Sequence, residues 1–344
     1  VEAYFLPSID EWRDDYERIK EDKKLAKSLA KQGDTSGATV EDEDASKKAI
    51  KSVINRRRHL VLLAQNQTGL NNLFKLISES YHEENFYRYP RVDYKLLDKY
   101  SEGVIAASAC LGGPYAGNYW ANREEGPEAV REAMRETTRQ FVKIFGDRWY
   151  GELQWNNIPE QHELNQYIIE VCQEFGVTLI STADSHYPNT EAWKDRELYK
   201  RLGWLGKGTP AWAEDNTELP DGVEEIGYEL YPKNGNQMWD AYKYYSKTAG
   251  VEYDDQLVMD SITETHNIAF NRIESFVPDT TVKLPDFVVP AGFTDAEALV
   301  NYALEGLRQR SLHDSTEYTD RLQMELDVIE DRGFSKYFLT MKAI

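Results

Sequence analysis

Residues 179–189, LISTADSHYPN, join an apolar strand pattern to an acid and an imidazole that lie two positions apart, with a proline directly after the next residue. Side chains two apart share a face in an extended chain, so Asp184 and His186 are expected on the same side at the end of this strand. A carboxylate and an imidazole presented together suit zinc, manganese or iron. The alternative is a polar turn that Asp184 caps while His186 packs against Tyr187. The residues themselves leave both interpretations open.

The same order of strand, turn and helix recurs upstream of this stretch. Strands are predicted at 1–6, 59–64, 103–108, 150–154 and 177–181, and helices at 70–81, 127–145 and 160–175. Strands that alternate with helices indicate an α/β fold, with a parallel sheet or an α/β barrel. The functional sites of such folds lie at the carboxyl ends of the strands.

The pattern is looser on either side of this region. Residues 12–57 are highly charged with mixed signs and predict an exposed insertion, with a helix-favouring run at 23–31. Further along the chain we expect a loop at 204–227, helices at 237–246 and 254–276, a proline-containing linker at 277–290, and amphipathic helices at 294–310 and 318–331.

Composition limits the classes of function. The chain has 344 residues, 41% of them apolar, which is enough for a large core. Its net charge of −20 repels phosphate backbones, so contact with nucleic acid requires a local basic patch or a bridging metal. The two cysteines exclude a disulfide scaffold and are typical of a reducing cytoplasm. No apolar run is long enough to span a bilayer, so no membrane partner is expected.

Three further residues beside predicted strands could carry chemistry. His59 opens an apolar strand, where a histidine is more often a hydrogen-bonded rim residue than a ligand. Cys110 precedes a glycine pair and is explained equally well as a buried thiol. Glu2 lies in the first strand, where a carboxylate normally faces solvent. Their common position beside the strands of one α/β unit would allow them to converge with Asp184.

Other reactive side chains carry weaker signals. Cys172 lies on the apolar face of a helix and is expected in the core, and surface positions are expected for His82, His162, His266 and His313. We find no phosphate-binding glycine loop, no nucleophile elbow and no paired-cysteine zinc motif.

Several blocks, taken in order, resemble a known family. They are HLVLLAQN at 59–66, TGLNNL at 68–73, EGVIAASACLGG at 102–113 and TADSHY at 182–187, then LEGLR at 304–308, YTDRLQMELDVI at 318–329 and GFSKYFL at 333–339. Together they resemble the bacterial replicative DNA polymerase III alpha subunit, whose amino-terminal part is a polymerase and histidinol phosphatase (PHP) domain. The last three blocks look like the segment that enters the polymerase palm.

The resemblance implies a fold and a site. It implies a PHP-type distorted seven-stranded α/β barrel at 1–280, incomplete at its start, followed at 281–344 by a mainly helical segment that begins the palm domain. It also implies a metal cluster of zinc, manganese or iron at the strand ends. The positions that match the family's ligands are Glu2, His59, Cys110, Asp184 and His186.

The resemblance also bears on activity. It implies a DNA-directed DNA polymerase acting in DNA replication, with primer-template DNA, deoxynucleotides, a sliding clamp and other replisome subunits as partners. The PHP domain would be metal-binding with phosphoesterase or 3′–5′ exonuclease activity, or alternatively a scaffold that docks replisome proteins. A free-standing PHP phosphatase is disfavoured by the palm-like blocks.

Both chain ends lie inside structural patterns, so we expect a fragment, and the acidic balance suggests a phage or unusual bacterial source. The family's upstream His-x-His and Asp-His motifs do not match any part of this chain. Its palm aspartates and their magnesium ions are expected beyond residue 344, so the chain alone is not expected to polymerise DNA.

Overall fold

The computed structural model describes residues 1–31, 56–204, 230–275, 281 and 287–344. The predicted loop at 204–227, most of the predicted linker and the middle of the charged insertion therefore lie outside the described residues. The chain divides into two units, Val1–Phe276 and Val277–Ile344. The assignment of the second unit to a palm domain stays a prediction.

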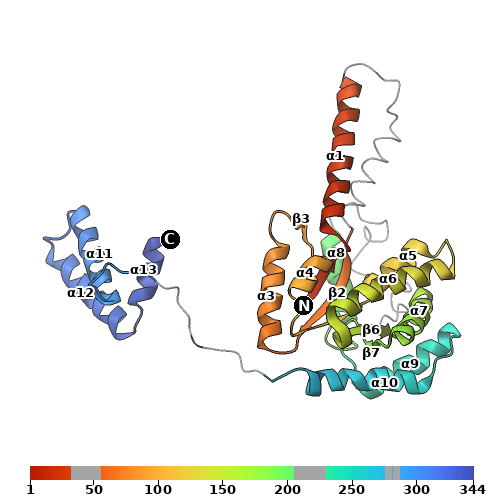
Figure 1. The fold of residues 1–344 in the computed structure, drawn as a ribbon. Helices are drawn as coiled ribbons and strands as arrows, with labels where there is room; N and C mark the ends of the chain where they lie inside the picture. The colour runs from red at the N-terminus through yellow and green to blue at the C-terminus, as the bar shows by residue number, and fades with distance from the viewer. Residues whose placement is uncertain (32–55, 205–229, 276–280, 282–286) are drawn as a thin grey trace. The chain divides into compact units, whose positions relative to one another are not determined.

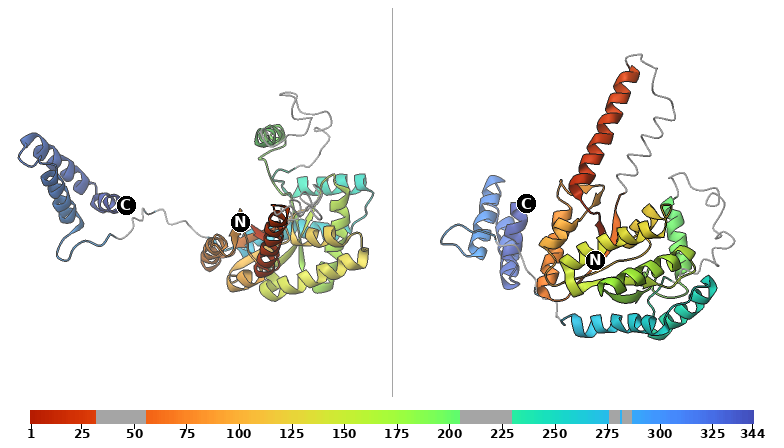
Figure 2. Two further views of the ribbon diagram at one scale, coloured as in Figure 1. Left: turned by 90° about the horizontal axis from the view of Figure 1, so that it is seen from above. Right: turned by 45° about the vertical axis from the view of Figure 1, so that its right-hand side comes forward.

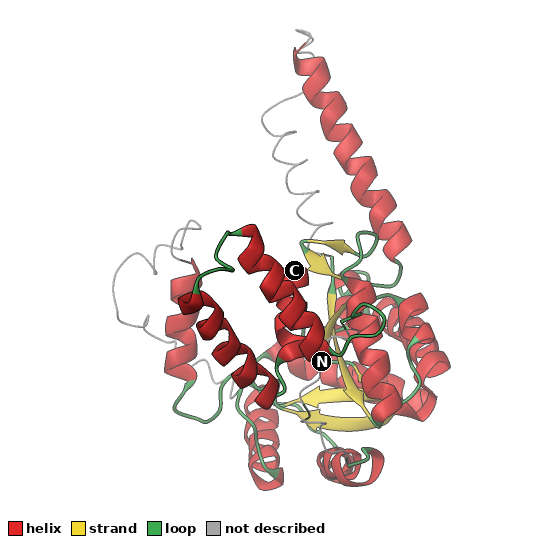
Figure 3. Ribbon diagram, turned by 90° about the vertical axis from the view of Figure 1, so that its left-hand side faces the viewer, coloured by secondary structure: helices red, strands yellow, loops and turns green. Residues whose placement is uncertain are grey.

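Unit 1 is built on a five-stranded sheet with the strand order β1-β2-β5-β6-β7. The strands are β1 (Glu2–Phe5), β2 (Arg58–Ala64), β5 (Val104–Ala107), β6 (Trp149–Gln154) and β7 (Thr178–Thr182), and β3 (Phe86–Tyr87) pairs separately with β4 (Tyr89–Pro90). Figure 3 shows these strands in yellow among the surrounding helices. The predicted α/β class is confirmed, but the described strands do not show a seven-stranded barrel.

The sheet is mixed, so the first of the two predicted alternatives, a parallel sheet, holds for three of its strands. β5, β6 and β7 run parallel, whereas β1 and β2 pair antiparallel and so do β2 and β5. The segment between β2 and β5 contains the helices α3 (Gln67–Ser80) and α4 (Tyr94–Lys99) as well as the β3–β4 ribbon. The chain therefore re-enters the sheet at the same end at which β2 leaves it, with Val104 opposite Ala64, and periodicity alone does not reveal this.

Helices cover both faces of the sheet (Figure 1). On one face lie α5 (Pro114–Asn122), α6 (Pro127–Phe145) and α7 (Pro159–Phe175), and on the other lies α10 (Asp255–Asn267), which follows α9 (Gly235–Ala249) and continues as a short π-helix, Ile268–Arg272. The predicted helix at 254–276 is thus shorter than expected. The helices α5 and α8 (Trp193–Trp204) were not predicted.

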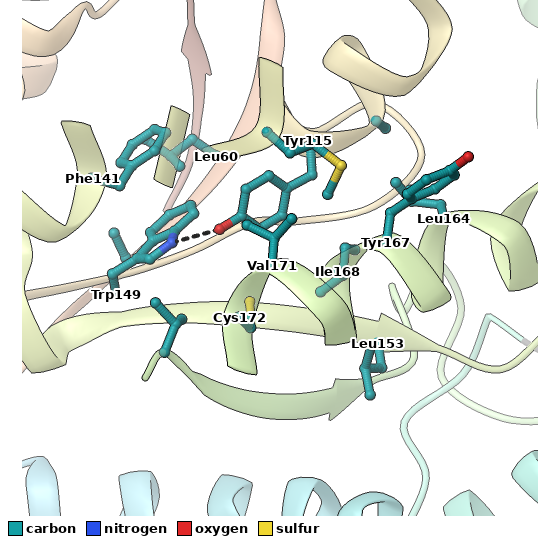
Figure 4. Close-up of a cluster of buried hydrophobic side chains, with 14 of the residues drawn as sticks. Leu60, Tyr115, Phe141, Trp149, Leu153, Leu164, Tyr167, Ile168, Val171 and Cys172 are labelled. Carbon is teal, nitrogen blue, oxygen red and sulfur yellow. Dashed lines mark hydrogen bonds between the residues drawn. The ribbon is translucent and has the colours of Figure 1, made fainter. Parts of the chain in front are cut away.

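The main core fills the layer between the sheet and α5–α7 (Figure 4). Phe141 stacks on Trp149 at 4.0 Å between ring centroids, and the indole N–H of Trp149 donates to the Tyr115 hydroxyl at 3.0 Å. Cys172 is buried in this layer, which confirms its predicted core position. The opposite face has a smaller cluster that includes Ile105 and Ile180. Every residue of β5 and β6 is buried, so both faces of these central strands are shielded from solvent.

Two peripheral parts complete the described chain. The helix α1 (Ile9–Lys31) extends away from the sheet, as the right view in Figure 2 shows, and it occupies the first part of the predicted insertion. Unit 2 contains α11 (Asp295–Gln309), α12 (Thr316–Asp331) and α13 (Ser335–Ala343), the first two close to their predicted positions. Among the described residues, no helix combines the length and apolar character needed to cross a membrane.

Candidate metal centre

The antiparallel course of β2 decides which residues meet at one edge of the sheet. His59 lies at the start of β2, and this end of β2 runs alongside the carboxyl end of β5, where Val61 is opposite Ala107. β1 pairs with the same part of β2, with Tyr4 opposite His59. Residues at the start of β2 and after the ends of β5 and β7 are therefore neighbours in space.

His59 lies against two other predicted site residues, Glu2 and Cys110, at this edge. The imidazole Nδ1 of His59 contacts the carboxylate of Glu2 and lies 3.9 Å from Sγ of Cys110. The backbone supports this arrangement, because the N–H of His59 donates to the carbonyl of Gly112 at 2.9 Å and the N–H of Gly112 reaches Sγ of Cys110 at 3.4 Å. The glycine pair thus forms the turn that carries Cys110 toward His59.

The Asp184–His186 motif follows the end of β7, which β6 separates from β5 in the sheet. Oδ1 of Asp184 is 3.9 Å from Nδ1 of His186, and that nitrogen also lies 2.6 Å from the carbonyl oxygen of Asp184. The N–H of His186 donates to the carbonyl of Leu230 at 2.7 Å, which anchors the loop. Asp184 and His186 are therefore partly exposed and held by backbone contacts.

Electrostatics connect the two groups. The pKa of the Cys110 thiol is raised to about 12, chiefly by burial and next by the negative charge of Asp184, with smaller contributions from Glu2 and Glu152. The thiol responds to the carboxylates of Glu2, Glu152 and Asp184, which come from three different strands or strand ends. The same carboxylates repel one another, and a bound cation would relieve that repulsion.

The donor atoms suit a metal in type and in part in spacing. Two ligands bound to one zinc through sulfur and imidazole nitrogen are separated by roughly 3.6 Å at tetrahedral angles, which is near the 3.9 Å between Cys110 and His59. In the described part of the chain, however, no group of three or more His, Cys, Asp or Glu side chains is arranged to hold a metal ion. The geometry therefore supplies suitable pairs of donors, and the ligand assignment stays a prediction.

Sequence reasoning missed Glu152. This residue lies in β6 and only 4% of its surface is exposed. Burial raises the pKa of its carboxyl group, and hydrogen bonds from Thr182 and from the backbone of Ala109 oppose that shift. The sequence carries no signal for it, because only the position of β6 between β5 and β7 in the sheet buries this carboxylate.

One histidine prediction is wrong. His162 is buried in α7, where its Nε2 lies 2.9 Å from the carbonyl oxygen of Asn156 and its Nδ1 lies 3.0 Å from the Tyr253 hydroxyl. The helix α9 and the segment before α10 cover the face of α7 that carries His162. His82, His266 and His313 are exposed, as predicted.

Comparison with known proteins shows which families this chain is similar to. The PHP domain family matches residues 9–156. The DNA polymerase III subunit alpha of Aquifex aeolicus is 38% identical over 291 residues, which are 83% of this chain and 23% of that protein. The corresponding subunit of Borreliella burgdorferi is 33% identical over 282 residues, 82% of this chain and 22% of that protein. That of Thermus aquaticus is 35% identical over 268 residues, 77% of this chain and 19% of that protein.

These matches agree with the resemblance seen in the sequence blocks. They also set a limit, because the chain spans less than a quarter of the length of each of these relatives.

Proposed function

We propose that this chain forms part of a replicative DNA polymerase. The proposal rests on its PHP domain and on its homology to the alpha subunits of bacterial DNA polymerase III. Polymerisation then belongs to the whole protein, with a palm magnesium site outside this chain. Primer-template DNA, deoxynucleotides, a sliding clamp and other replisome subunits are its proposed partners.

Within that protein we assign a metal-binding role to the PHP domain. The observation that carries this proposal is the convergence of Glu2, His59 and Cys110 at one sheet edge, with the charge of Asp184 acting on the same thiol. His186 completes the proposed ligand set. Zinc, manganese or iron bound there would polarise a phosphodiester and lower the pKa of a bound water.

The chain's own residues would prepare such a site in distinct ways. Glu2 contacts Nδ1 of His59, the same nitrogen that lies 3.9 Å from the Cys110 sulfur, so a metal bound among these three residues would take the place of that contact. Burial favours the protonated thiol of Cys110, so binding a metal requires loss of that proton, and affinity rises with pH. Phosphoesterase chemistry, in the form of a 3′–5′ exonuclease, is the activity proposed for the intact protein.

We also propose that the five-stranded sheet is part of a larger, seven-stranded PHP barrel. β1 is at the end of the strand order, and in the described residues a single bridge, between Phe5 and Val92, pairs its outer edge. The rest of that edge would be available to further strands. For unit 2, the proposed role is the start of the palm.

A scaffold role is the second candidate. It is favoured by the observation that the described residues contain no ready group of three metal ligands. In that case the PHP domain would stabilise the polymerase and dock replisome proteins. A free-standing phosphatase fits less well, because the similarity to the polymerase subunits covers 83% of the chain and the PHP match ends at residue 156.

Metal analysis of the 344-residue chain and of four variants tests the metal-binding role. Cys110→Ser and His186→Ala remove proposed ligands, whereas the matched controls Cys172→Ser and His266→Ala change the same residue types elsewhere. We expect inductively coupled plasma mass spectrometry to find zinc, manganese or iron in the parent chain and in both controls, with a severalfold loss in the two ligand variants. Absence of metal from all five proteins, or equal content in all of them, would leave the scaffold role.

A further inference from the structure

The backbone is constrained at both strand ends that carry proposed ligands. Ala109, directly before Cys110, has a φ of 57°, and Asp184 has a φ of 47°. A left-handed conformation is unfavourable for alanine because of its Cβ atom, and such a residue persists only where the surroundings hold it. Something must therefore hold the turn after β5, and the same question arises at the end of β7.

Glu152 touches both strand ends. One carboxylate oxygen accepts the backbone N–H of Ala109 at 2.8 Å, and the other accepts the hydroxyl of Thr182 at 2.7 Å. Its own N–H donates to the hydroxyl of Ser108 at 2.8 Å. β6 lies between β5 and β7 in the sheet, so a single side chain on the middle strand reaches its two neighbours.

The chemistry of these contacts favours positioning over ligation. Both oxygens of the Glu152 carboxylate already accept a hydrogen bond. Hydrogen bonds to an ionised carboxylate are shorter and stronger than those between neutral groups. Only 4% of Glu152 is exposed, so loss of either donor would leave an acceptor with no water to replace it. An apolar residue would fill the same space without holding either turn.

We propose that Glu152 is a positioning residue that fixes the left-handed turn at Ala109 and the end of β7 at Thr182, and so sets the distance between Cys110 and Asp184. This inference rests on the proposed metal-binding function for its purpose. The two hydrogen bonds that the Glu152 carboxylate accepts, from Ala109 and Thr182, are called the clamp below, and they are present in the metal-free chain.

The clamp is tested by the alkylation rate of Cys110 in the metal-free 344-residue chain, followed by peptide mass spectrometry with iodoacetamide as the probe. Cys172 is fully buried and reports global unfolding in the same sample. In Glu152→Ala we expect Cys110 to react roughly tenfold faster, the effect of losing hydrogen bonds that oppose a local opening, while Cys172 stays protected. Amide hydrogen exchange of the Ala109 N–H should accelerate in parallel.

Two comparisons separate the clamp from charge and from packing. Glu152→Gln removes the charge but can still accept from Ala109 and bond to Thr182, so its Cys110 rate should stay near that of the parent chain. Gln154→Ala removes a buried polar side chain of similar size from the same strand. Its amide donates to the Thr182 hydroxyl at 3.4 Å, but the variant leaves both hydrogen bonds of the Glu152 carboxylate in place, so the rate should stay unchanged. A rate in Glu152→Gln equal to that in Glu152→Ala would overturn the inference in favour of simple electrostatics.

Variants of Thr182 test the other half of the clamp and remain informative if Glu152→Ala fails to fold. Thr182→Val deletes the hydroxyl that donates to Glu152 and should raise Cys110 reactivity, whereas Thr182→Ser keeps the hydroxyl and should restore the parent rate. Equal rates in the two variants would contradict the clamp.

Binding of Co²⁺ to the same proteins separates this inference from the proposed function. A sulfur-to-cobalt charge-transfer band in the parent chain that weakens in Glu152→Ala and recovers in Glu152→Gln supports both. If no protein shows the band, but the alkylation rates follow the expected order, the metal-binding role fails and the clamp stands.

Discussion

The buried imidazole of His162 makes the stability of unit 1 sensitive to acid. Burial lowers the pKa of this side chain below the 6.5 of an ordinary histidine, and the hydrogen bond to the Asn156 carbonyl only partly offsets that shift. The unfolded chain therefore binds a proton at a higher pH than the folded chain does. The contribution to the free energy of unfolding is complete above pH 6.5 and is lost as the pH falls toward the folded-state pKa.

We therefore expect His162→Gln to flatten the pH dependence of stability. Urea unfolding of the parent chain should give a lower free energy at about pH 5 than at about pH 7. In His162→Gln the difference between the two pH values should shrink, although overall stability falls by about 1–3 kcal/mol through lost hydrogen bonds. His82→Gln, at an exposed histidine, is the matched control and should keep the parent profile. An unchanged profile in His162→Gln would assign the acid sensitivity to other groups.

The sequence predicts the location of some residues of the candidate site and of the core, but not of others. Asp184 and His186 could be placed at a strand end because alternation and a turn signal surround them, and Cys172 could be placed in the core by its helix face. Glu152 could not, because an acid in a short strand is usually solvent-facing, and only the pairing of β6 between β5 and β7 buries it. His162 failed for the same reason, since its partner Tyr253 lies 91 positions away in the chain.

At the scale of elements, Gly112 and Gly113 in the turn after β5 differ in how well they would accommodate a side chain. A Cβ atom on Gly113 would lie 2.0 Å from the carbonyl oxygen of Ser108 and 3.0 Å from that of Cys110, both backbone atoms. A Cβ atom on Gly112 would meet only the His59 ring, at 3.4 Å. The turn that delivers Cys110 therefore depends on the second glycine much more than on the first.

We expect Gly113→Ala to cost about 3 kcal/mol of unfolding free energy, because the backbone must shift to remove the overlap. Gly112→Ala, its neighbour and control, should cost less than about 1 kcal/mol. Urea midpoints at constant slope would measure both. Similar losses in the two variants would mean that the turn relaxes without depending on Gly113.

The type of most long elements follows from local pattern, but their pairing does not. The strands β2, β5, β6 and β7 and the helices α6 and α7 all lie within a few residues of their predicted positions. The antiparallel pairing of β2 with β5 depends on the path through α3, α4 and the β3–β4 ribbon. That pairing is also what places His59 next to Cys110, so the candidate site could be named by residue but not assembled from the sequence.

At the scale of the whole molecule, unit 2 differs from unit 1 in how little it buries. Its buried residues, among those described, are Ala298, Leu326, Ser335 and Leu339. Large apolar side chains of this unit are exposed, including Val328, Phe334 and Met341. An apolar surface of this kind is typical of a segment covered in a larger assembly, which agrees with the proposed place of unit 2 at the start of a palm domain.

The net charge of −20 leads to the last prediction, on DNA. Phosphate backbones bind proteins mainly through cations, and a strongly acidic chain repels them except where a metal or a basic patch intervenes. We expect the 344-residue chain to bind a fluorescently labelled single-stranded oligonucleotide weakly in fluorescence anisotropy without divalent ions, and severalfold more tightly with Mn²⁺. The gain should be lost in Cys110→Ser and kept in Cys172→Ser, because only the former removes a proposed ligand. Tight binding without metal that weakens steeply with salt would instead reveal a basic surface and place DNA away from the sheet edge.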